Sequence, residues 1–197
     1  MQPETEVPQE NAMPNAAAMG SCGLIQEGIF LFTMPVVAQT VHPVIEWILV
    51  ENMVAERRKF LQLIICCPGG EVNAGFALVD VMAASSVPIR TTGIGMIASC
   101  GLMIFMAGQK GHRTITPNTN ILSHQYSWGG EGKEHELIAR QRAYKLSSKR
   151  MMDHYRKHTK LSVEKIRKEL MPAEDRWLTA REAVKLNLAD KIKKLGT

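Results

Sequence analysis

The chain has 197 residues, enough for one domain with a sizeable core but too few for two comfortable ones. Hydrophobic residues make up 45% and charged residues 22%, as in an ordinary soluble globular protein. The net charge of +5 is uneven, because residues 133–170 carry twelve basic and five acidic residues while 1–55 carry no Lys or Arg. These basic residues alternate with a helical apolar stripe, which favours a solvated helix face over a nucleic-acid site.

The four cysteines lack both metal-type spacing and the pattern of a disulfide framework, so we expect no metal and a reducing, cytoplasmic compartment. Residues 91–109 carry no charge and approach the length of a membrane span. Four glycines and three hydroxyl residues dilute this run, so it predicts a strand, a turn and a buried helix instead. Residues 1–26 lack the basic start of a signal peptide and are expected to be flexible or processed.

Periodicity predicts one domain over 27–197 in which strands alternate with helices. In chain order we expect a strand at 28–32, a helix at 40–56, strands at 60–67 and 88–95 with a helix at 74–85 between them, a helix at 100–108, strands at 113–116 and 120–125, and helices at 133–158, 162–170 and 178–192, the last followed by a terminal strand. This alternation is typical of an α/β domain with a largely parallel sheet.

Several local signals refine these elements. Pro43 fits the first turn of its helix, and Ser162 is a candidate N-cap. Thr179 and Glu182 have the spacing of a capping box. In the long helix at 133–158, apolar residues seven apart predict a stripe that buries one side: Leu137, Tyr144 and Met151.

Ser99 and Cys100 stand inside an apolar run, where a strand is expected to turn directly into a buried helix. Free backbone N–H groups at such a turn favour a developing negative charge, so Ser99 is a candidate nucleophile. The alternative is a serine that only caps the helix. Cys100 is the more reactive atom when ionised, but a buried cysteine is usually packing. Its backbone N–H, however, lies where an oxyanion donor is needed.

Two further segments could contribute to chemistry. The turn "PGG" at 68–70 permits backbone angles that a Cβ would forbid, and it leaves an N–H exposed at a strand end. His124 closes an apolar strand whose end can meet the end of the strand before Ser99, where ligands collect in α/β sheets. The other five histidines are expected to be solvated. Four aspartates remain possible partners for His124, and chemistry alone does not choose among them: Asp80, Asp153, Asp175 and Asp190.

Four segments together resemble the ClpP family of serine peptidases (peptidase family S14), the proteolytic core of energy-dependent proteases. They are "CCPGGEVNAG" (66–75), "GMIASCGLMIFMAGQKGHR" (95–113), "PNTNILSHQ" (117–125) and "EDRWLTAREAVKLNLADKI" (174–192). The resemblance implies that Ser99 is the nucleophile, His124 the general base and Asp175 the acid that orients the imidazole. It further implies an oxyanion hole formed by the N–H groups of Gly70 and Cys100.

The same resemblance implies an α/β fold built as a spiral of β-β-α units, shared with the crotonase group, with helix 133–158 as a protruding handle. Family members stack two heptameric rings into a closed tetradecameric chamber that hydrolyses unfolded polypeptides. An AAA+ unfoldase delivers the substrates and uses the ATP, so no cofactor is expected in this chain. Neither nucleic acid nor membrane is an expected partner, and residues 1–26 would correspond to the axial-loop region.

Three departures from the family pattern bear on partners rather than on catalysis. The tail at 1–26 does not match the usual axial loop. Gln62 and Ile64 replace tyrosines that commonly form docking pockets for the unfoldase, which makes docking uncertain. Tyr126 stands where a proline normally follows His-Gln.

Two other functions compete with an active serine endopeptidase. One is a weakly active or regulatory subunit that assembles with a related chain, and the other is an acyl-CoA enzyme of the crotonase group. Both are disfavoured by the presence of Ser99 and His124.

Overall fold

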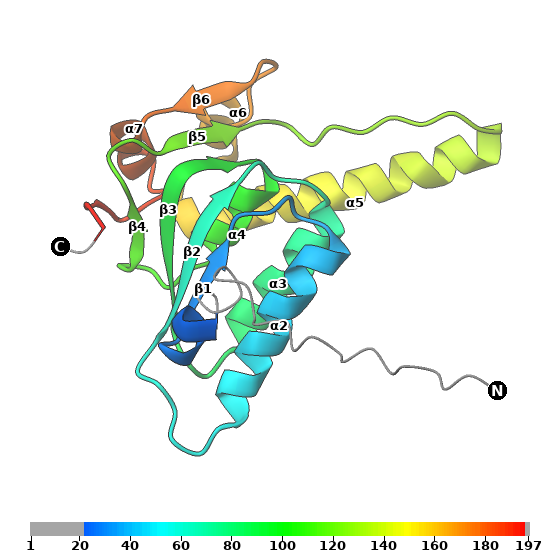
Figure 1. Cartoon of the computed structure of the whole chain (residues 1–197). Coiled ribbons are helices and arrows are strands. Elements are labelled where there is room, and N and C mark those ends of the chain that lie inside the picture. The colour runs from blue at the N-terminus through cyan, green and yellow to red at the C-terminus, as the bar shows by residue number, and fades with distance from the viewer. Residues whose placement is uncertain (1–21, 196–197) are drawn as a thin grey trace, which may run out of the picture.

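The structure, a computed structural model, describes residues 22–195 (Figure 1). The strands are β1 Ile29–Phe32, β2 Leu61–Cys67, β3 Ile89–Ala98, β4 Arg113–Ile115, β5 Asn120–Ser123, β6 Arg176–Leu178 and β7 Lys191–Ile192. The helices are α2 Ala38–Met53, α3 Val72–Ala84, α4 Cys100–Met106, α5 Glu134–Thr159, α6 Val163–Glu169 and α7 Ala180–Lys185. The predicted α/β class is confirmed. Most of the N-terminal segment predicted to be flexible or processed lies outside the described residues.

The sheet is parallel except at one edge. Its main path runs β1-β2-β3-β4-β7, while β5 pairs with β3 and β6 pairs antiparallel with β5. Strand β3 serves two neighbours: residues 91–93 pair with β4, and residues 96–98 pair with β5. The sequence predicted that this strand ends at Gly95, which is wrong. Gly95 instead adopts φ 58, so the chain bends there and continues as a strand.

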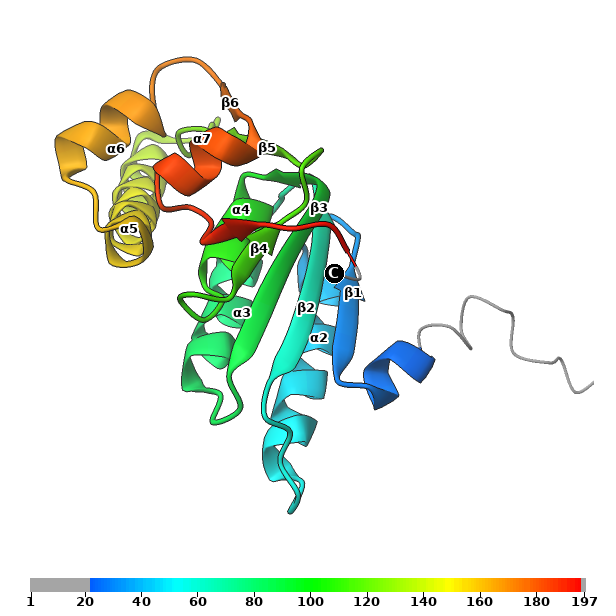
Figure 2. The ribbon, with the colours of Figure 1, turned by 90° about the vertical axis from the view of Figure 1, so that its left-hand side faces the viewer.

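Helices α2 and α3 pack on the same side of this sheet (Figures 1 and 2). Strand β2 alternates buried and half-buried residues along its length, which is the period-2 pattern of a strand with one fully covered face. All seven residues of α4 are buried. Burial of α4 explains why residues 91–109 lack charge: the run is the centre of the core and not a membrane span. No helix within residues 22–195 is long and apolar enough to cross a membrane.

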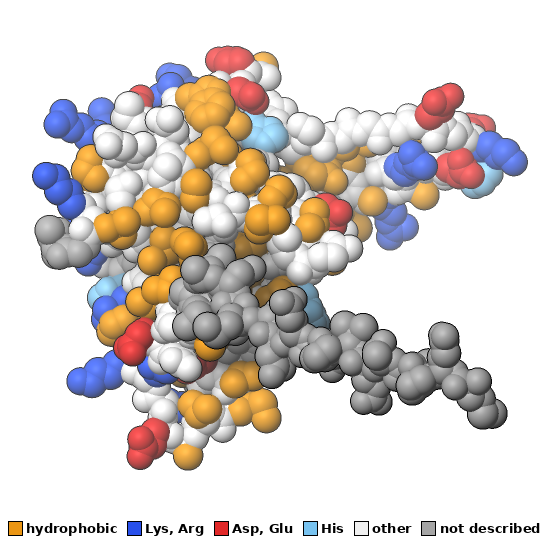
Figure 3. All heavy atoms as spheres, viewed as in Figure 1, with side chains coloured by type: hydrophobic (Ala, Val, Ile, Leu, Met, Phe, Trp, Pro, Cys, Tyr) orange, Lys and Arg blue, Asp and Glu red, His pale blue; other side chains and the backbone are white. Residues whose placement is uncertain are grey.

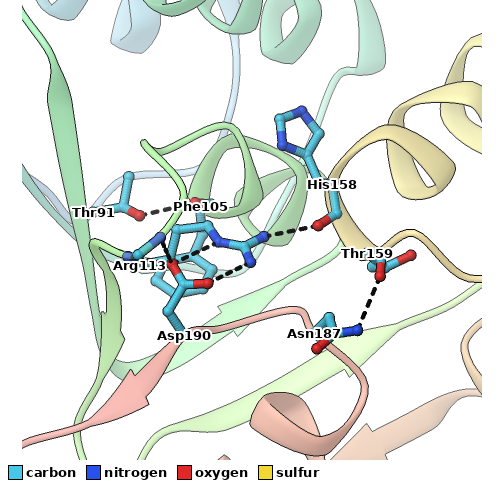
Figure 4. A network of polar contacts seen from close by, with 8 residues as sticks. Thr91, Phe105, Arg113, His158, Thr159, Asn187 and Asp190 are labelled. Carbon is cyan, nitrogen blue, oxygen red and sulfur yellow. Dashed lines mark hydrogen bonds and ion pairs between the residues drawn. The ribbon is translucent and has the colours of Figure 1, made fainter.

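A buried ion pair joins the C-terminal segment to the sheet (Figure 4). Arg113 is only 1% exposed, and its guanidinium contacts Asp190 at 2.7 Å and 3.1 Å. The Asp190 carboxylate also accepts hydrogen bonds from the backbone N–H groups of Gly111 and Arg113. Arg113 in turn donates to the His158 carbonyl at the end of α5. This pairing holds β7, β4 and α5 together, because breaking one partner would leave a buried charge unpaired.

Helix α5 extends away from the body as a handle (Figure 1). Its 26 residues span about 39 Å at 1.5 Å per residue. Only four of them are buried: Met151, His154, Tyr155 and Thr159. The predicted apolar stripe is therefore confirmed at Met151 and wrong at Leu137, which is 38% exposed, while Tyr144 is half-buried. The N-terminal turns of α5 lie beside the segment that precedes the helix, in which Tyr126 and Trp128 stack on Tyr144.

Other boundaries differ from prediction for local reasons. Helix α2 begins at Ala38, so Pro43 lies beyond the first turn. Helix α7 spans only six residues and stops before Asn187, which has φ 59. The caps are confirmed, because Ser162 accepts from the Lys165 N–H, and Thr179 and Glu182 bond reciprocally to each other's N–H.

His154 and His158 were predicted to be solvated, and this is wrong. His154 is 5% exposed, its Nε2 lies 2.9 Å from the Met103 carbonyl, and its ring centroid lies 4.4 Å from that of His158. Burial lowers the pKa of His154 to about 4. Burial, followed by the charges of His154 and nearby basic residues, also lowers the pKa of His158.

These lowered pKa values predict acid sensitivity. Between pH 6.5 and about 4, unfolded chains bind a proton at His154 and folded chains do not, so the free energy of unfolding falls as the pH falls. The slope from one such residue is at most about 1.4 kcal/mol per pH unit. In urea unfolding at fixed chain concentration, His154→Leu should lessen this fall. His135→Leu, on the exposed end of α5, should retain the wild-type pH dependence, and equal curves for all three proteins would contradict the prediction.

Candidate active site

Ser99 occupies the turn between β3 and α4 in a conformation that few non-glycine residues adopt. Its φ is 52° and its ψ is −120°. Such outliers are costly, persist only where the surroundings enforce them, and cluster at functional sites. The side chain makes no capping hydrogen bond to α4. The alternative that Ser99 merely caps the helix is therefore wrong.

The hydroxyl of Ser99 bonds instead to His124. The distance from Ser99 Oγ to His124 Nε2 is 2.8 Å, and both residues are half-buried. The sheet causes this contact: β3 and β5 pair in parallel up to Ala98 and Leu122, and the Ser99 N–H donates to the Leu122 carbonyl at 2.9 Å. Because parallel strands end at the same edge, the residues that follow them meet there. A hydroxyl hydrogen-bonded to an imidazole is the core of a serine hydrolase site.

The Pro-Gly-Gly turn packs directly against this pair. A Cβ on Gly69 would lie 2.6 Å from the Ser99 Cβ and 3.2 Å from the Cys100 nitrogen, and φ at Gly69 is +100°. Only glycine allows the turn to approach Ser99 this closely. The end of β2 therefore comes to lie beside the strand–helix turn of β3 and α4.

Two backbone N–H groups, those of Gly70 and Cys100, belong to the two turns that meet at this corner. Val36 bonds on both sides of Gly70, donating to the Gly69 carbonyl and accepting from the Glu71 N–H. This bridge leaves the polar backbone groups of Gly70 on the opposite side, where its carbonyl accepts from Cys100 Sγ at 3.1 Å. The N–H of Cys100 opens α4, so no carbonyl one turn earlier is available to accept from it.

The thiol of Cys100 is not placed for attack. The residue is 1% exposed, and Sγ donates to the Gly70 carbonyl. Burial raises the pKa of this thiol to about 11, so it remains protonated near neutral pH. The interpretation of Cys100 as a packing residue agrees with this environment.

Among the four candidate acids, two are paired elsewhere. Asp190 pairs with Arg113, and Asp153 pairs with Lys149 on α5. Asp80 is exposed on α3. Asp175 is exposed and makes no hydrogen bond or ion pair with any residue of the described range 22–195. The structure thus joins Ser99 and His124 but does not bond Asp175 to the imidazole.

The pairing of β5 with β6 ends one residue before His124 and one residue after Asp175. Strands β5 and β6 pair antiparallel, with Ser123 opposite Arg176. Extending that register by one residue sets Asp175 opposite His124, and side chains at opposite positions share one face of the sheet.

A cavity of about 510 Å³ opens next to the segment that follows His124, although neither Ser99 nor His124 lines it. It lies among the segment after His124, helix α5 and helix α6, and its lining includes Gln125, Tyr126, Tyr144, Met151, Met152 and Met171. Polar and charged side chains also line it, so its wall is mixed: Lys145, Ser148, Lys149, Asp153, Arg156 and Arg167. Among the described residues, no group of three or more His, Cys, Asp or Glu side chains could hold a metal ion.

Comparison with known proteins agrees with this geometry. The family model described as Clp protease matches residues 15–195. The chain is 32% identical over 170 residues to the ATP-dependent Clp protease proteolytic subunit of Deinococcus radiodurans, covering 86% of this chain and 81% of the relative. It is 37% identical over 139 residues to the ATP-dependent Clp protease proteolytic subunit 2 of Thermobifida fusca, covering 70% of this chain and 66% of the relative.

The fold and the comparisons define a serine peptidase with a mixed α/β architecture. The chain belongs to the Clp protease family, and the resemblance found in its motifs is confirmed.

Sequence reasoning missed the polar residues on either side of His124. Gln125 donates to the carbonyls of Met171 and Pro172, and Ser123 donates to the Leu170 carbonyl. The signal was present, since "SHQ" places polar side chains around the histidine at the end of an apolar strand. Nothing in the sequence showed which distant carbonyls they would reach.

The contact between Gly69 and Ser99 yields a test. A methyl group in Gly69→Ala would force the turn and Ser99 apart, and peptidase activity should fall on the order of a hundredfold, as expected when a reacting group shifts by about 1 Å. Gly111→Ala is the matched control, because Gly111 also has positive φ (+86°) but has nothing within 4 Å of its added Cβ. Equal activities of the two variants would contradict this arrangement.

Proposed function

We propose that this chain is the proteolytic subunit of a Clp-type protease, in which Ser99 attacks peptide carbonyls with His124 as general base. The observation that carries the proposal is the 2.8 Å contact between Ser99 Oγ and His124 Nε2 on a chain of this family. His124 removes the hydroxyl proton as the Ser99 oxygen bonds to the carbonyl carbon. The imidazolium then protonates the leaving amine, and water releases the acyl group by the same steps.

The oxyanion formed during attack lies between the N–H groups of Gly70 and Cys100. Support comes from the close packing of the glycine turn against Ser99 and the Cys100 nitrogen, and from the place of Cys100 as the first residue of α4. Loss of one such donor typically costs about 2.7–4 kcal/mol of transition-state stabilisation. Because both donors belong to the backbone, this part of the site depends on the glycine turn and the strained Ser99 more than on side-chain identity.

Asp175 is the acid that orients His124 in the competent state. The register of β5 and β6 supports this role, as do the ion pairs that occupy Asp153 and Asp190. A carboxylate here would hold the imidazole in the tautomer that accepts from Ser99 and would stabilise the imidazolium. In the structure the acid is turned to solvent, so its alignment is one step in forming the active site.

Association into stacked heptameric rings agrees with the apolar surface that a single chain leaves uncovered. Large hydrophobic residues are exposed on α2 and α5, including Leu49, Val50, Met53, Ile138 and Leu146. Figure 3 shows hydrophobic side chains gathered over the body of the molecule and charged ones at the far end of α5. Patches of this kind mark interaction surfaces.

Substrates of such a chamber would be unfolded polypeptides delivered by an AAA+ unfoldase, which would supply the ATP chemistry, so the chain itself needs no cofactor. The printed names of both relatives, which call them ATP-dependent, support this arrangement. Gln62 and Ile64 are half-buried on β2, where the family's docking tyrosines are replaced, so the partner's docking loop would meet different chemistry. Free thiols at all four cysteines agree with a cytoplasmic location.

The nucleophile is tested by labelling. The purified chain should form an adduct at Ser99 with a serine-reactive phosphonate and cleave a fluorogenic peptide. Ser99→Ala should lose the adduct and at least about a thousandfold of the activity, while the exposed Ser86→Ala should retain both. Labelling at Cys100, or undiminished proteolysis by Ser99→Ala, would overturn the proposal, and assembled particles without any adduct would indicate a regulatory subunit.

The orienting acid is tested separately. Asp175→Asn should lower kcat on the order of 10²–10⁴-fold, because an amide favours the wrong tautomer of His124. Glu174→Gln removes the neighbouring exposed carboxylate and should change little. Wild-type kcat in Asp175→Asn particles of unchanged size would exclude Asp175 as the orienting residue.

A further inference from the structure

A buried chain of hydrogen bonds lies behind His124, on the opposite face of β5. Ser123 is 0% exposed and Tyr155 is 1% exposed, and their hydroxyl oxygens are 2.9 Å apart. Ser123 Oγ also lies 2.5 Å from the Leu170 carbonyl. A carbonyl can only accept, and a serine hydroxyl carries one proton, so Ser123 donates to Leu170 and Tyr155 donates to Ser123.

This chain of bonds joins three elements that are distant in sequence. Tyr155 belongs to the base of the handle helix α5, Ser123 is the last residue of β5, and Leu170 ends α6. Buried polar groups are costly unless all are satisfied, and here the full set is satisfied only in one relative placement of the three elements. Burial raises the pKa of Tyr155 to about 12, so its hydroxyl remains a donor across the working pH range.

The position of the chain of bonds relates it to the reacting residues. Ser123 directly precedes His124, and Leu170 begins the segment that leads to Asp175. Gln125, on the other side of His124, donates to the Met171 and Pro172 carbonyls of that same segment. The two residues that flank His124 therefore both bond to residues 170–172, and Tyr155 of α5 bonds to one of the two, Ser123.

We propose that Tyr155 is a positioning residue that acts through Ser123: the two hydroxyls hold the end of β5 against residues 170–172, and so align His124 with Asp175. The inference rests on the proposed function, since it assumes that His124 is the base. The same turn of α5 makes a second contact: His154 bonds to the Met103 carbonyl of α4, the helix that begins directly after Ser99. The base of the handle thus contacts the elements that carry both Ser99 and His124.

The test compares Tyr155→Phe, Ser123→Ala and the double variant in the full chain. Each single variant should lower kcat on the order of tenfold with KM nearly unchanged. The double variant should lose no more than the worse single, because both hydroxyls act through one contact. The acid limb of the kcat/KM profile should move to lower pH, since an imidazole that loses its carboxylate partner is protonated less readily.

Thr159→Val is the matched control. Thr159 is another buried hydroxyl of α5, but it donates to the Tyr155 carbonyl of its own helix and accepts from the Leu161 N–H just beyond that helix. It should lower stability without moving the pH profile. If Tyr155→Phe does not assemble, Ser123→Ala alone decides, because it keeps the aromatic ring in the core.

The outcomes separate this proposal from the proposed function. Wild-type kcat and an unmoved pH profile in Tyr155→Phe and Ser123→Ala, with Ser99 still essential, would overturn the positioning role alone. Equal effects from Thr159→Val would also overturn it, by reducing it to general stability. Activity that persists in Ser99→Ala would overturn the proposed function instead.

Discussion

The site depends on one backbone pairing, the short parallel contact between the end of β3 and β5. It brings Ser99 and His124 to the same edge of the sheet and ends in the hydrogen bond from the Ser99 N–H to the Leu122 carbonyl. The pairing exists because β3 bends at Gly95 and changes neighbours from β4 to β5. A serine and a histidine 25 residues apart thereby reach 2.8 Å.

Buried contacts around this pairing hold Ser99 and His124 in place. Helix α4 is wholly buried and holds Ser99 at its first turn, and the ion pair of Arg113 with Asp190 ties the C-terminal segment to the sheet. The hydroxyls of Ser123 and Tyr155 add a third constraint beneath His124. Asp175 alone lacks such support, because it lies on an exposed segment before β6. The least constrained member of the proposed triad is therefore the one whose alignment can vary.

Much of this was predictable because the informative patterns are local. Alternation of strands and helices, the cap at Ser162 and the capping box at Thr179 depend on residues a few positions apart. The motifs around Ser99 and His124 likewise indicated the family. The solvation of His154 and the burial of the α5 stripe were predicted wrongly, because both depend on which element packs against α5.

The sequence by itself determined the class of fold, the family and the residue types available for chemistry, because backbone propensity and motif spacing depend on residues close together in the chain. Only the tertiary structure decided that the Ser99 side chain bonds to His124 and not to its own helix, that Cys100 is buried and that Ser123 contacts Tyr155. These depend on contacts between segments far apart in the chain. Their energies come from burial and from partners that no local pattern specifies.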